Sequence, residues 1–165
     1  MKIMLDPGHM AGHNPGSVSG YYEGTRMYEY AMVFRDELTK RGHTALLTRS
    51  SVTDNPSLTQ RGRMAAEQGC DLFLSLHTNA TGDGKDDDVS GVTVYRSVNR
   101  SGDQAVGETL GKAVAATMKT NFRACKTRPS AASTMVAPLW AITGRCSLPS
   151  GPVTFTAVSH ERAVA

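Results

Sequence analysis

Apolar and polar positions follow one another in blocks that predict strands and helices in turn. A short apolar run at residues 2–5 stops at the turn signal Asp6-Pro7-Gly8, so it predicts a buried strand that leads into a loop. From Met27 onward the apolar residues recur at helical spacing, and the pattern ends at Lys40-Arg41-Gly42, with cations in the last turn and a glycine stop. This second block predicts an amphipathic helix.

The alternation of strand and helix patterns continues through most of the chain. The predicted strands lie at residues 43–49, 71–76 and 91–96, with two weaker ones at 135–143 and 152–158, and the predicted helices at residues 57–69 and about 102–121. Such alternation is typical of an α/β fold, in which helices cover a sheet. We therefore expect a single α/β domain with a twisted, mostly parallel sheet of about six strands flanked by helices.

Length and composition limit the classes of protein that fit this chain. Its 165 residues, 39% of them hydrophobic and 20% charged, have room for one ordinary domain. The formal net charge of +3 is too small to indicate a nucleic-acid partner, and the three cysteines lack the spacing of a thiolate zinc site. No stretch reaches the roughly 20 apolar residues of a membrane span, and no signal peptide is visible. We expect a monomer without nucleic-acid or membrane partners.

Two histidines follow predicted strands at the positions where α/β sheets bind ligands. His9 comes just after the strand at residues 2–5, and His77 closes the strand at residues 71–76. Ligands bind beyond the carboxyl ends of strands in such sheets, so the two imidazoles would lie at the same edge. They could then share a metal ion.

A catalytic zinc site needs a third protein ligand, and a glutamate commonly completes a pair of histidines. Glu23 lies at the junction of a glycine-rich loop and the first predicted helix, where its side chain can turn back toward the strand ends. Glu29 lies almost two turns into that helix and is placed less well. His13 competes with His9, but it lies deeper in the loop with no strand to fix it.

Motifs in residues 2–120 follow one another in the order of a known family. They are Leu5-Asp6-Pro7-Gly8-His9, Glu23 before a helix that stops at Gly42, Thr48-Arg49, Leu58 to Arg61, Ser75-Leu76-His77-Thr78-Asn79, and a glycine-led strand from Gly91. By these motifs the chain resembles the zinc-dependent N-acetylmuramoyl-L-alanine amidases, a family that includes bacterial wall hydrolases and phage endolysins.

This resemblance implies both an activity and a set of site residues. Residues 1–165 would be a zinc amidase catalytic domain that hydrolyses the amide bond between N-acetylmuramic acid and L-alanine in peptidoglycan. The Zn²⁺ ligands would be His9, Glu23 and His77, with Asn79 and Arg61 as substrate-binding candidates. Arg61 has a second interpretation, as an anchor that holds loops through hydrogen bonds. The protein would act on the bacterial wall, outside the cell or after release by a phage.

The resemblance weakens from about residue 126. The family places a glutamate, which acts as general base and acid, after a hydrophobic run on its last strand, but the similar run at residues 152–157 ends in Ala157. Glu161, four residues further on, is the remaining candidate for the general base. One alternative is a form that retains zinc and binds peptidoglycan without cleaving it. Another is a different metal-dependent amide or peptide hydrolase on the same scaffold.

Overall fold

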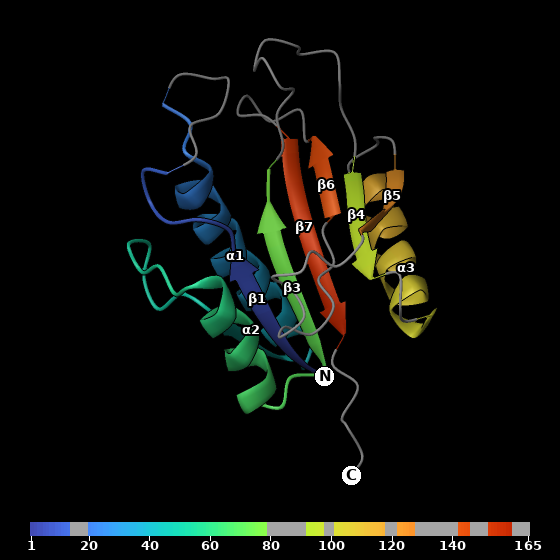
Figure 1. The fold of residues 1–165 in the computed structure, drawn as a ribbon, viewed down its shortest axis with the longest axis horizontal. Helices are drawn as coiled ribbons and strands as arrows, with labels where there is room; N and C mark the ends of the chain where they lie inside the picture. Colours follow the sequence, from blue (N-terminus) through green and yellow to red (C-terminus); the bar gives the residue numbers. More distant parts are fainter. Residues whose placement is uncertain are drawn as a thin grey trace.

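A computed structural model describes residues 1–13, 20–78, 92–97, 101–117, 122–127, 142–145 and 152–159. The strands among them are β1 Lys2–Pro7, β2 Thr44–Leu47, β3 Leu72–His77, β4 Val92–Ser97, β5 Phe122–Thr127, β6 Ile142–Arg145 and β7 Pro152–Ser159. The helices are α1 Glu23–Lys40, α2 Leu58–Glu67 and α3 Ser101–Thr117. The predicted α/β class, with helices that flank a sheet, is confirmed (Figure 1).

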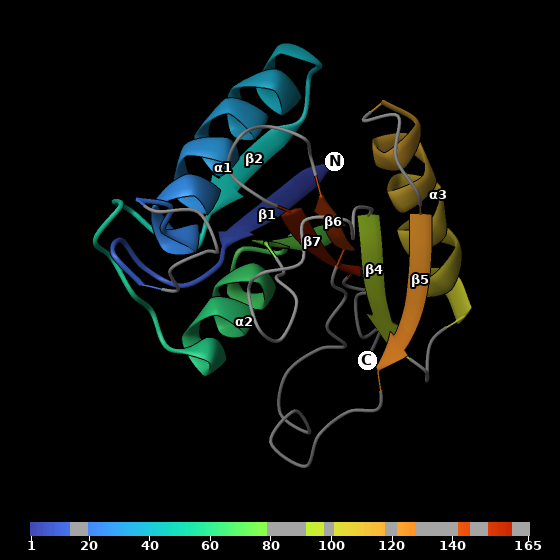
Figure 2. The ribbon, with the colours of Figure 1, turned by 90° about the horizontal axis from the view of Figure 1, so that it is seen from above.

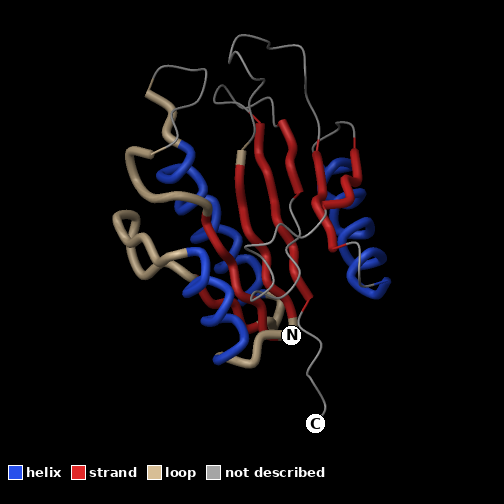
Figure 3. The backbone as a smooth tube through the Cα atoms, viewed as in Figure 1, coloured by secondary structure: helices blue, strands red, loops and turns tan. Residues whose placement is uncertain are grey.

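The strands described form one mixed sheet in the order β2-β1-β3-β7-β6-β4-β5. Helices α1 and α2 carry the chain back after β1 and β2, so β2 and β3 each pair with β1 in parallel. Strand β4 is likewise parallel to β5. Viewed from above, α1 and α2 lie on opposite sides of the sheet (Figure 2). In Figure 3, helices are seen at both sides of the row of strands.

The second half of the sheet differs from the mostly parallel arrangement that we expected. β7 is antiparallel to both β3 and β6, and β6 is antiparallel to β4. Seven strands of the sheet lie in the described part of the chain where about six were expected, because β5 follows α3 in a stretch that lacks a clear strand pattern. Most of the strand predicted at residues 135–143 lies outside the described residues, and β6 begins at Ile142.

Two local features fix the ends of the helices near the site. Helix α1 begins at Glu23, and the chain leaves it through Gly42, which has a φ of 79°. That left-handed conformation favours glycine and ends the helix. Helix α2 starts with a capping box in which Ser57 and Gln60 each bind the other's backbone N–H.

The core lies between the sheet and its helices. Met4, Leu5, Leu74 and Leu76 are almost completely buried in β1 and β3, and Met27 of α1 packs in the same cluster. Burial of this apolar surface stabilises the pairing of β1 with β3, which sets the geometry of the strand ends. Within the described part of the chain, no helix combines the length and apolar character needed to cross a bilayer.

Candidate metal centre

Three segments that lie far apart in the sequence meet at one edge of the sheet. β1 ends at Pro7 and pairs there with Leu76 of β3, so the residues that follow the two strands are neighbours. His77 is the last residue of β3, His9 lies two residues beyond β1, and Glu23 opens α1. The fold therefore brings together the three side chains that the sequence singled out.

Glu23 bridges the two histidines. Its Oε2 lies 3.3 Å from His9 Nε2, and its Oε1 lies 2.9 Å from His77 Nδ1. One potential ligand atom from each residue lies within 4.8 Å of the others. The imidazole rings stand perpendicular, with centroids 5.0 Å apart. Two nitrogens and a carboxylate oxygen that converge in this way can hold a divalent transition metal.

The centre is buried on one side and open on the other. Glu23 is only 3% exposed, whereas the side chains of His9 and His77 are 35% and 31% exposed. The backbone N–H of Thr78 donates to Glu23 Oε1 over 2.8 Å. This bond fixes the carboxylate from the protein side, so the open side faces solvent and any substrate.

Two glycines allow the three segments to approach so closely. A Cβ atom added at Gly8 would lie 2.3 Å from Cε1 of the His77 ring, and one added at Gly24 would lie 1.8 Å from the Met10 carbonyl oxygen. Neither distance is possible for a real side chain. Glycine at these positions therefore lets the loop after β1 pass under His77 and against the start of α1.

A buried polar network lies beneath the centre. Asp6 Oδ1 accepts hydrogen bonds from Thr48 Oγ1 at 2.6 Å and Arg61 Nη1 at 2.8 Å, and Oδ2 accepts one from Ser75 Oγ at 2.6 Å. All four residues are at most 5% exposed. The charge of Arg61 is thus balanced by the Asp6 carboxylate inside the protein.

Arg61 could contact substrate only if some of its N–H groups were free, whereas an anchor would use them within the protein. Its five N–H groups make five hydrogen bonds to acceptors within the protein, which are Asp6 Oδ1, Asn55 Oδ1 and the carbonyls of Pro7, His9 and Pro56. The geometry favours the anchoring role, because these bonds occupy every donor that a substrate would use.

The remaining candidates are distributed as follows. His13 and Glu29 are not among the three converging donors, and Glu29 forms an exposed ion pair with Arg26, 2.8 Å long. Asn79 and Glu161 lie outside the described residues.

The register of β7 bears on the position expected for the general base. Thr154 is the β7 residue that pairs with His77, and Ala157 pairs with Leu74. At about 3.3 Å per residue, this pairing puts Ala157 roughly 10 Å along β3 from the metal centre. In the backbone register, residue 157 is therefore not opposite His77.

One further residue at the centre, Tyr21, was not identified from the sequence. Its phenol is buried, hydrogen-bonds the side chain of Thr78 and lies close enough to Glu23 to feel its charge. Burial raises the pKa of Tyr21 to about 12, so the phenol stays neutral at physiological pH. An aromatic residue two positions before a helix has no pattern that separates it from an ordinary core residue.

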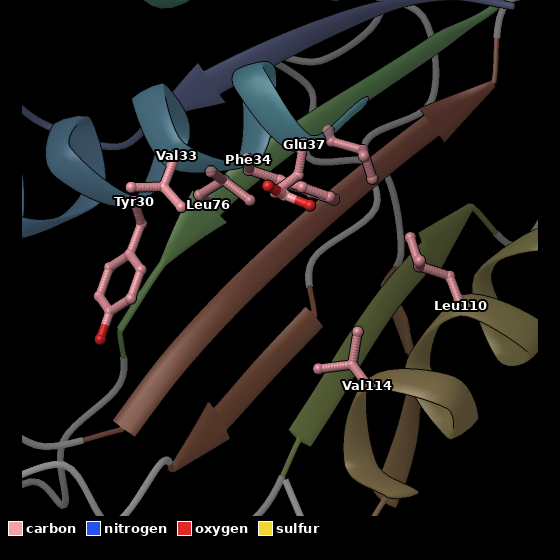
Figure 4. Close-up of a pocket in the computed structure, with 8 residues that line it drawn as sticks. Tyr30, Val33, Phe34, Glu37, Leu76, Leu110 and Val114 are labelled. Atoms are coloured by element: carbon pink, nitrogen blue, oxygen red, sulfur yellow. The ribbon is translucent and has the colours of Figure 1, made fainter. Parts of the chain in front are cut away.

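An apolar groove lies apart from the metal centre, between α1 and α3 over β3 (Figure 4). Its volume is about 260 Å³. The residues that line it are Tyr30, Val33, Phe34, Glu37, Leu74, Leu76, Leu110 and Val114. None of the three converging donors lines this groove, so it is separate from the chemistry described above.

Comparisons with known proteins show which family the chain is similar to. Residues 3–163 match the family model described as N-acetylmuramoyl-L-alanine amidase. The sporulation-specific N-acetylmuramoyl-L-alanine amidase of Bacillus subtilis is 39% identical over 85 residues, which are 50% of this chain and 32% of the relative. The amidase AmiA of Escherichia coli is 32% identical over 112 residues, 67% of this chain and 37% of the relative. The matches thus span about a third of these relatives' own length.

The fold is also similar to that of a solved amidase structure. The catalytic domain of CwlV, an N-acetylmuramoyl-L-alanine amidase from Bacillus (Paenibacillus) polymyxa, superposes with a TM-score of 0.64 at 25% sequence identity. The superposition covers 75% of this chain and 69% of that domain.

Proposed function

Since the chain belongs to the N-acetylmuramoyl-L-alanine amidase family, we propose that it hydrolyses the amide bond between N-acetylmuramic acid and L-alanine in peptidoglycan. Residues 1–165 form one catalytic domain in this proposal, active as a monomer on the bacterial wall, outside the cell or after release by a phage. The observation that carries the proposal is the convergence of His9, Glu23 and His77 at the edge of the sheet.

These three residues are the proposed zinc ligands. Two imidazole nitrogens and one carboxylate are a common donor set of catalytic zinc sites, which keep a further position open. The partly exposed imidazoles and the buried Glu23 support such a half-open site. When bound, zinc supplies Lewis-acid polarisation of the scissile carbonyl and lowers the pKa of water. The Thr78 N–H donates to Glu23 Oε1, which helps to hold the carboxylate between the two rings.

Proton transfer and substrate contact are assigned to residues outside the described part of the chain. We propose Glu161 as the general base and acid and Asn79 as a substrate contact beside His77. β7 ends at Ser159, which pairs with Leu72 at the end of β3 opposite His77. For this role the chain beyond Ser159 would have to bring Glu161 back to the His77 end of the sheet. Arg61 serves as an anchor rather than as a substrate ligand in this proposal.

One observation favours a second candidate function. Ala157 stands at the end of the run where the family resemblance places a glutamate, and alanine cannot transfer a proton. A chain that kept the three donors but lacked a general base would bind zinc and peptidoglycan without turnover. The names of the related proteins favour the hydrolase over this inactive form.

Digestion of purified peptidoglycan by zinc-loaded protein tests the proposal. We expect new free N-terminal alanine without new reducing sugar ends. The His77→Ala variant should lose both its zinc and this activity, and Glu161→Gln should keep zinc but lose alanine release. Reducing ends alone would show a glycosidase instead. Zinc-loaded protein that sediments with the wall and releases nothing would establish the inactive form.

A further inference from the structure

Two buried arginines hold the loop that carries His9. Arg61 of α2 donates from Nη1 to the Pro7 carbonyl at 2.8 Å and from Nη2 to the His9 carbonyl at 3.1 Å. The same guanidinium binds the Asp6 carboxylate at the end of β1. One planar group thus connects the last residues of the strand with the backbone of the first candidate ligand.

Arg49 connects the same loop with the helix that carries Glu23. Its Nη1 donates to the Gly24 carbonyl at 2.8 Å and to the Gly8 carbonyl at 3.3 Å. These carbonyls belong to the neighbours of Glu23 and His9 in the chain. Arg49 is 0% exposed, and its other nitrogens donate to the Asp54 and Val52 carbonyls. The side chain therefore sets the distance between two of the three ligand-bearing segments.

The backbone conformation of His9 explains why these contacts are needed. Its φ of 56° lies in the left-handed region, and it is the one residue other than glycine that does so in the described part of the chain. Residues other than glycine adopt this conformation uncommonly, so surrounding contacts help to maintain it. The bond from Arg61 to the His9 carbonyl is a contact of this kind.

We propose that Arg49 and Arg61 are positioning residues that hold His9 and Glu23 in the metal-binding arrangement before any ion arrives. This inference rests on the proposed metal site. The third donor, His77, is fixed by β3 itself, because β3 pairs with β1. The two arginines thus hold the two donors that the sheet itself does not hold, His9 and Glu23.

Lysine cannot replace either arginine in this role. It keeps the positive charge, but its three donors radiate from one nitrogen, whereas each guanidinium reaches carbonyls on separate segments. Removal of such outer contacts typically weakens metal binding by about 10- to 100-fold. We expect Arg61→Lys and Arg49→Lys to weaken zinc binding by about this amount.

The test measures zinc affinity by competition with a chromophoric chelator, together with the visible spectrum of the Co²⁺-loaded protein. Arg63→Lys is the matched control, because Arg63 is an exposed arginine two residues beyond Arg61 on α2. Circular dichroism of the metal-free proteins establishes that each variant is folded. We expect both lysine variants to show weaker binding and an altered Co²⁺ spectrum, and the control to match the unmodified protein.

The outcomes separate this inference from the proposed function. An unmodified protein that binds no zinc refutes the metal site itself. Folded lysine variants with unchanged affinity and an unchanged Co²⁺ spectrum refute the positioning role and leave the metal site standing. If Arg61→Lys does not fold, Arg49→Lys carries the test alone, because the Arg49 guanidinium binds the Gly8 and Gly24 carbonyls beside His9 and Glu23. An unchanged zinc affinity and Co²⁺ spectrum in a folded Arg49→Lys variant would then overturn the positioning role.

Discussion

Replacing Asp6 by alanine tests whether the buried network beneath the metal centre stabilises the fold. The substitution leaves the Arg61 guanidinium without its carboxylate at a position that is 4% exposed. Breaking a buried ion pair from one side costs about 3–5 kcal/mol. Thr48 and Ser75 also lose their acceptor, at about 1 kcal/mol each. We therefore expect a loss of about 5–7 kcal/mol in the free energy of unfolding.

Urea unfolding of the metal-free protein, followed by circular dichroism, measures this loss without a contribution from bound zinc. Ordinary domains have a free energy of unfolding of about 5–15 kcal/mol, so the variant should be only marginally stable. Asp36→Ala is the control, because Asp36 forms an exposed pair with Arg35 at 3.0 Å that is worth less than about 1 kcal/mol. If Asp6→Ala cost no more than this control, the network would not stabilise the fold as argued.

Four further substitutions, one of them a control, test the site and the surface. Glu23→Gln should lower the zinc content measured after dialysis, because an amide is a poorer ligand, whereas Glu29→Gln should leave it unchanged. Gly8→Ala should also lose zinc without loss of helix signal, since its methyl group would collide with a ligand ring, and full zinc occupancy would contradict the observed packing. The hydrogen bond from Lys40 lowers the pKa of Glu37 to about 2 from 4.5. The stabilisation from Glu37 is therefore complete above about pH 4.5 and declines as the pH falls toward 2. Melting temperatures of Glu37→Gln should depend less on pH in that interval, and an unchanged slope would contradict this prediction.

The first half of the fold was predictable because its local patterns agree with its tertiary contacts. The apolar run before Asp6 and the helical spacing after Met27 became β1 and α1. Parallel pairing of β1 with β3 then brings Pro7 beside Leu76, as the strand order implied. His9, Glu23 and His77 could be selected for the same reason, since their places at the ends of elements are visible in the sequence.

Other features depend on contacts that leave no local pattern. The direction of β7 is set by its pairing with β3 and β6. The sequence pattern of residues 152–158 does not distinguish a parallel strand from an antiparallel one. The left-handed conformation of His9 depends on its position against Arg61, over fifty residues away in the chain. Tyr21 gave no signal because burial beside Thr78 is a tertiary property.

The pairing of β1 with β3 also determines when the metal centre can exist. Met4 pairs with Phe73, so this contact closes a loop of about 70 residues and cannot form before β3 is available. Long-range pairings of this kind slow folding, because the chain loses conformational entropy in closing the loop before the contact stabilises it. A chain still emerging from the ribosome would have His9 and Glu23 but no His77. The appearance of metal binding during refolding would therefore mark the moment when the two strands meet.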